Sequence, residues 1–163
     1  LIEIIGRDGR NAVLLTLVIV FLLLWVDYRN PGHSLMAMIP LALGVFWMVG
    51  FMHLTGMKLT IMNFVGLPMI IGIGIDYGVH ILHRRRYEGR GKIRIVYSST
   101  GKAILLTSLT TMLAFGSLVF SIWRGFGQLG GALFLGVGAC FLTTVIVLPG
   151  IIGMLERKNS KKN

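Results

Sequence analysis

The residue with the clearest chemical potential in this 163-residue chain is Asp76, a carboxylic acid in the middle of a long apolar run that reads GIGIDYG over residues 72–78. A carboxylate inside a membrane-spanning helix is costly, so it usually faces the bundle interior or a water pathway and moves ions or protons. A dry environment favours the neutral acid, which lets one group take up and later release a proton. The alternative is a neutral carboxyl group that only hydrogen-bonds to a neighbouring helix.

Two histidines extend this pattern along the same predicted helix. His80 and His83 follow Asp76 at spacings of four and seven residues, so the three side chains share one helix face. Imidazole binds and releases protons near neutral pH, and the stripe therefore suggests a proton route from Asp76 to one membrane surface. It is equally open that both histidines simply lie at the interface.

The next apolar run places hydroxyl groups at a matching depth. At a rise of 1.5 Å per residue, Asp76 and Thr107 both lie on the order of 10–12 Å from the end that joins the two runs. We therefore predict that the two helices pack tightly and that Asp76 lies within direct or one-water reach of Thr107 and Thr111. Hydroxyl groups in membrane helices also commonly bond to their own backbone, which is the alternative.

The composition requires a membrane around these residues. Hydrophobic residues make up 55% of the chain, charged residues only 13%, and the mean hydropathy is +0.80. Soluble domains carry about 25% charged residues, so the soluble enzyme classes are largely excluded. We predict an all-α membrane protein, a five-helix transmembrane bundle in one domain over residues 1–163. Its expected spans are 12–26, 35–53, 60–83, 101–122 and 126–154.

The basic residues predict an orientation. The formal net charge is +10, and twelve of the sixteen Lys and Arg residues lie on one side of the predicted spans. Because such residues gather in cytoplasmic loops, we expect a basic cytoplasmic loop over 84–100, a basic cytoplasmic tail over 155–163 and an external N-terminus. This explanation makes nucleic-acid binding an unlikely use of the charge.

The remaining features indicate packing. Small residues four apart let membrane helices approach closely, and we assign this role to five glycines: Gly72, Gly74, Gly78, Gly127 and Gly131. The sequence shows no metal-ligand spacing, no phosphate-binding loop and no nucleophile motif. We therefore expect no catalytic residue, no metal and no cofactor.

Two segments carry a resemblance to a known family. Residues 63–80, NFVGLPMIIGIGIDYGVH, resemble the Gly-x-x-x-Asp-Tyr helix of the resistance-nodulation-division (RND) superfamily, and the nearest likeness is to MMPL-type and hopanoid-associated lipid exporters. Residues 99–116, STGKAILLTSLTTMLAFG, are similar to the following helix of that family. The likeness covers essentially all five spans.

The resemblance implies a fold and a function. This chain would be the C-terminal five helices of a twelve-helix secondary transporter, without the first helix of its half, the extracytoplasmic porter domain and the N-terminal half. Asp76 and Tyr77 would form the proton relay, His80, His83, Thr107 and Thr111 would support it, and H⁺ would be the coupling ion. The expected location is the bacterial inner membrane, the expected partners are membrane lipids, a hydrophobic or lipid substrate and the missing half, and the oligomeric state is open.

Two other functions compete with this hypothesis. A sterol-sensing-type domain is also a five-helix unit of the superfamily, and it would bind a lipid or regulate without pumping. An intramembrane aspartyl protease needs two carboxylates in the membrane and a glycine directly before one of them. Ile75 precedes Asp76 and no second acid lies in a predicted span, which argues against the protease.

Overall fold

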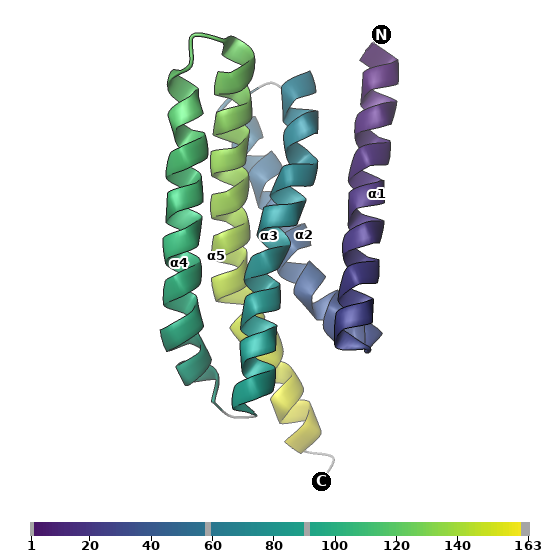
Figure 1. Cartoon of the computed structure of the whole chain (residues 1–163), viewed down its shortest axis with the longest axis vertical. Coiled ribbons are helices and arrows are strands. Elements are labelled where there is room, and N and C mark those ends of the chain that lie inside the picture. The colour runs from purple at the N-terminus through teal and green to yellow at the C-terminus, as the bar shows by residue number, and fades with distance from the viewer. Residues whose placement is uncertain (1, 58–59, 90–91, 161–163) are drawn as a thin grey trace.

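The computed structural model describes residues 2–57, 60–89 and 92–160. It contains five long helices and one short 3₁₀ turn: α1 Ile2–Tyr28, α2 Pro31–Leu54, α3 Ile61–Glu88, α4 Ile93–Ser117, η1 Leu118–Phe120 and α5 Arg124–Ser160. All five helices are long and apolar enough to cross a membrane. They run alternately up and down, so the two termini lie at opposite ends of the bundle (Figure 1).

The helices are longer than the predicted spans, and the largest difference concerns the predicted basic loop over 84–100. α3 continues to Glu88 and α4 begins at Ile93, so most of this segment is helical. Hydropathy marks only the part of a helix that lies in hydrocarbon, whereas Arg and Lys favour helix formation and are stabilised at a helix C-terminus. α5 likewise continues to Ser160 through most of the predicted tail. Lys58, Arg90, Lys161 and Lys162, which contributed to the predicted charge bias, lie outside the described residues.

The core lies where α2, α3 and α5 cross. A Cβ atom on Gly44 of α2 would lie 2.7 Å from the Cα atom of Cys140 on α5, and one on Gly74 of α3 would lie 2.8 Å from the Cys140 Sγ atom. The glycines therefore allow three helices to meet at one buried side chain. In the most apolar stretch of α3 and of α5, 50% of the residues are buried, whereas in that of α1 and of α4 only 11% are buried.

The outer helices are attached differently from what the sequence suggested. α4 packs mainly against α5 and less against α3, and Figure 1 shows α5 between them. We predicted tight packing between the helices that carry Asp76 and Thr107. The structure differs because the glycine-rich stretch of α5, including Gly130 and Gly138, accepts α4: a Cβ atom on Gly130 would lie 2.5 Å from the carbonyl oxygen of Phe115.

A tight connection fixes the end of α1 against α2. Arg29 adopts a left-handed conformation with φ of 50°, which reverses the chain within two residues. Asn30 then caps α2, because its side-chain oxygen accepts a hydrogen bond from the backbone N–H of Gly32 at 3.0 Å. The turn thereby holds the last residues of α1 beside α3, where the site described next begins.

Candidate functional site

The two faces of α3 have opposite surroundings. Ile70, Ile71 and Ile81 are fully or almost fully buried against the bundle. Asp76 and His80 lie on the other side and are exposed, as is Gly72, where an added Cβ atom would meet nothing within 4 Å. We call the exposed side, with Gly72, Asp76 and His80, the outer face of α3. It places a carboxyl group at the surface of the five-helix unit, in the middle of an apolar helix.

The predicted partners of Asp76 on α4 are engaged elsewhere. The Thr107 hydroxyl donates to the carbonyl oxygen of Ala103 at 3.1 Å, and the Thr111 hydroxyl donates to that of Thr107 at 2.8 Å. Within the described part of the chain, no hydrogen bond joins Asp76 to α4. The expected pairing is not formed in this unit, because these hydroxyl groups satisfy themselves on their own helix while α4 lies against α5.

Tyr77 points away from Asp76. Consecutive residues on an α-helix are separated by about 100° around its axis, so the neighbour of an exposed residue can face the core. Tyr77 is 4% exposed, and its ring meets Phe141 of α5 edge-on, with centroids 6.2 Å apart. Among the described residues, its hydroxyl group is buried without a hydrogen-bond partner. The predicted relay pair is therefore adjacent in sequence but divided between two faces.

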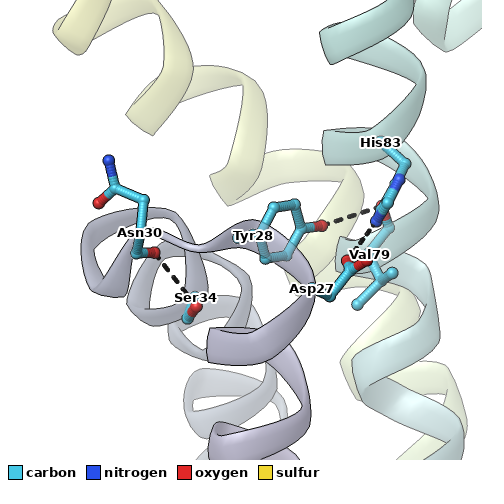
Figure 2. Close-up of polar contacts among 6 residues, drawn as sticks. All are labelled: Asp27, Tyr28, Asn30, Ser34, Val79 and His83. Carbon is cyan, nitrogen blue, oxygen red and sulfur yellow. Dashed lines mark hydrogen bonds and ion pairs between the residues drawn. The ribbon is translucent and has the colours of Figure 1, made fainter.

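A polar cluster forms at the end of the same stripe (Figure 2). The Nε2 atom of His83 lies 2.5 Å from the Oδ2 atom of Asp27, which belongs to α1. The Tyr28 hydroxyl donates to the carbonyl oxygen of Val79 at 3.4 Å, and its ring lies 5.2 Å from the His83 ring. His33 of α2 also stacks on the Tyr28 ring, with centroids 6.4 Å apart. We call Asp27, Tyr28 and His83 the junction cluster.

Asp27 was not among the predicted site residues, because it lies one residue beyond the predicted span of residues 12–26. The signal was present: the first and third helices run in the same direction, so an acid at the end of one and a histidine at the end of the other lie at the same membrane surface. Hydropathy could not show that α1 turns this acid toward α3. The row of histidines on α3 therefore ends at a carboxylate that α1 supplies.

The five predicted packing glycines divide in the same way as the faces of α3. Gly74 and Gly78 lie at contacts with other helices, and a Cβ atom on Gly78 would be 3.1 Å from the Ala37 carbonyl oxygen. Gly127 and Gly131 of α5 also have close neighbours, at 3.4 and 2.8 Å. Gly72 does not, since it lies on the outer face, and its predicted role in packing is not met within this chain.

No group of three or more His, Cys, Asp or Glu side chains that could hold a metal occurs within residues 2–57, 60–89 and 92–160. The outer face and the junction cluster carry carboxyl, imidazole and phenol groups, all of which can exchange protons. These groups extend from the middle of α3 to its C-terminal end, where α1 contributes Asp27 and Tyr28.

Comparison with known proteins assigns the chain to a family. The sequence model of the MMPL family matches residues 1–163. The chain is 31% identical over 161 residues to a putative membrane protein of Methanocaldococcus jannaschii. The aligned region covers 95% of this chain and 42% of that protein. It is 28% identical to the hopanoid transporter HpnN of Burkholderia multivorans, over 93% of this chain and 17% of the transporter.

A further relative belongs to another transport system. The protein-export membrane protein SecF of Methanopyrus kandleri is 31% identical, over 92% of this chain and 56% of SecF. The chain thus spans between about a sixth and a little more than half of the length of these relatives. No solved structure matches it.

Proposed function

Because the chain belongs to the MMPL family, whose relatives here include transporters, we propose that it is the membrane-embedded part of a proton-driven exporter of hydrophobic or lipid cargo. The observation that carries this proposal is the position of Asp76 on the outer face of α3. A carboxyl group in the middle of a membrane helix costs several kcal/mol when it faces lipid. An ionisable group kept there therefore calls for a functional explanation.

The outer face must be covered in the working protein. We propose that a second transmembrane half covers it, with water reaching Asp76 at some stage of the cycle. The relative HpnN is long enough to hold such a half, since this chain matches only 17% of it. The covering half would also supply polar partners that Asp76 does not find among the described residues of this chain.

The proposed cycle uses the protonation of Asp76 as its switch. Asp76 takes a proton from the outside and becomes neutral, which lowers the cost of keeping the outer face dry by several kcal/mol. Release of the proton toward the cytoplasm restores the charge and requires water or a cation beside it. Inverting a two-state population needs about 5.5 kcal/mol. The free energy released when one proton moves down its gradient is of the same order, so it can move the bundle between two packings.

The other predicted residues have supporting roles in this proposal. His80 and His83 accept the proton from Asp76. Tyr77 packs against Phe141 in the core, so its hydroxyl group would join the relay only if α3 were turned in another state of the cycle. Thr107 and Thr111 would join only if α4 approached α3 in another state of the cycle. The coupling ion is H⁺, and the proposed location is the bacterial inner membrane with a cytoplasmic C-terminus.

The test is Asp76→Asn in the full-length protein, with Asp8→Asn as the matched control. Asp76→Asn keeps the shape of the side chain but removes its ability to carry a proton. Asp8 is an exposed acid near the N-terminus of α1, far along that helix from Asp27. We expect Asp76→Asn to leave the protein folded and inserted and to abolish proton-coupled export in reconstituted vesicles. Export at the wild-type rate would show that Asp76 is only a polar packing group.

A second candidate is a role in protein export, and the similarity to SecF is the observation that favours it. Both candidates use the same residue, but their cargo differs. In cells that lack the protein, a lipid exporter predicts the loss of a lipid from the cell surface with normal protein secretion. A SecF-like function predicts retention of secreted proteins with unchanged surface lipids.

A further inference from the structure

We infer that Asp27 of α1 is the last proton-holding residue of the exit path that begins at Asp76, and that it acts through its hydrogen bond to His83. This inference rests on the proposed function, because it assigns the end of the path along which that function moves protons. It adds a second helix to the relay.

The three groups on α3 are spaced for stepwise transfer. His80 lies about 6 Å along the axis from Asp76, and His83 about 4.5 Å further, from the rise per residue. Asp76 and His80 are both exposed on the outer face, so one or two waters can bridge each step once the face is hydrated. From His83 the proton reaches Asp27 directly, without an intervening water.

The exposures of the two final residues fit an exit. The side chain of His83 is 34% exposed and that of Asp27 is 46% exposed. The path therefore passes from the membrane interior to a half-covered imidazole and then to a carboxylate that is open to water.

Among the charged groups near His83, Asp27 is the acid that contacts it. Arg84 and Arg86 follow His83 on α3, Arg29 follows the end of α1, and the rings of Tyr28 and His33 lie on the side toward α2. Glu88 is paired with Arg84 at 2.7 Å, whereas the carboxylate of Asp27 contacts the imidazole itself.

The proton balance is simple. Neutral Asp76 gives its proton through water to the imidazole of His80 and becomes a carboxylate. His80 passes a proton to His83, whose imidazolium is stabilised by the Asp27 carboxylate. The proton then moves to Asp27 and from there to bulk water, and both histidines return to the neutral form. One proton has moved and no bond other than those to hydrogen has changed.

The experiment measures proton flux through the full-length protein in vesicles of phosphatidylethanolamine and phosphatidylglycerol with a pH-sensitive dye trapped inside. Asn at position 27 can still accept a hydrogen bond from His83 but cannot hold a proton. We expect Asp27→Asn to slow the flux by about a hundredfold, the lower end of what a positioned proton-transfer group contributes. Asp27→Glu should restore it, and so should imidazole added to the medium, after subtraction of the flux in protein-free vesicles.

Control variants separate the relay from a merely structural junction. His33→Gln alters the same junction without touching Asp27 and should leave the flux unchanged. The double variant Asp27→Asn with His83→Gln should be no slower than the slower single variant, because the two residues act in series. A flux close to wild type in Asp27→Asn, or a loss that imidazole does not restore, overturns the inference. Since Asp76→Asn tests the proposed function by itself, the two ideas can fail separately.

Discussion

The inner and outer faces of α3 are built from similar residues but have different neighbours. On the inner face, Gly74 and Gly78 lie against α5 and α2, and the isoleucines beside them are buried. On the outer face, Gly72 has open space around it and Asp76 is exposed. The inner face is buried by the other helices of this chain, whereas the outer face carries Asp76 and His80 and is exposed.

This difference indicates how the helix divides its work. The inner face holds α3 rigidly at the crossing with α2 and α5, which fixes the depth of Asp76 in the bundle. In the proposed function, the outer face exchanges water and protons without disturbing the core. A residue on one face should therefore affect stability, and a residue on the other should affect transport.

The largest effect on stability is expected from Gly74→Ala on the inner face. Its Cβ atom would lie 2.8 Å from the Cys140 Sγ atom and 2.9 Å from the Leu41 Cδ1 atom, so the three-helix crossing must shift, at a cost of about 1–3 kcal/mol. Gly72→Ala on the outer face meets no neighbour among the described residues and should stabilise this 163-residue chain by up to about 1 kcal/mol. Unfolding of the same chain in a denaturing detergent measures both. Equal effects would contradict the distinction between the faces.

A smaller effect on stability is expected from the threonines of α4 and α5. The Thr143 hydroxyl is buried and reaches the Pro40 carbonyl oxygen on α2 at 2.9 Å. Thr143→Val should therefore destabilise the protein by about 1 kcal/mol. Thr107→Val removes only a bond within α4 and should change neither the unfolding free energy nor export measurably. A clear loss of export in Thr107→Val would show that α4 closes onto Asp76 during transport, as the sequence suggested.

The smallest effect is expected from His80→Ala on the outer face. A water molecule can take the place of the imidazole between Asp76 and His83, because water-mediated hydrogen bonds are nearly as favourable as direct ones. Export should fall several-fold at most, far less than in Asp76→Asn, and the unfolding free energy should stay unchanged. Transport assays of the two variants side by side make the comparison. Complete loss in His80→Ala would make the imidazole an obligatory carrier.

The amino-acid sequence by itself determined the class of the protein. Charged segments and short polar turns separate five apolar runs. These runs determine five membrane helices and their alternating directions, because the transfer of each helix into hydrocarbon depends on its own residues. The periodicity of 3.6 residues per turn likewise fixes that Asp76, His80 and Gly72 share a face. The resemblance of residues 63–80 and 99–116 to the MMPL-type exporters also predicted the family.

Only the tertiary structure decided which helix each face meets. Asp76 and Thr107 have matching depths, but depth does not determine the neighbour, and α4 turned out to lie on α5 because the glycines of α5 accept it closely. Asp27 lies one residue beyond the predicted span of residues 12–26, and only the two-residue turn at Arg29 and Asn30 shows that it lies against His83. Contacts between helices depend on the shapes of both surfaces at once, and residues 56 positions apart carry no local pattern that announces their pairing.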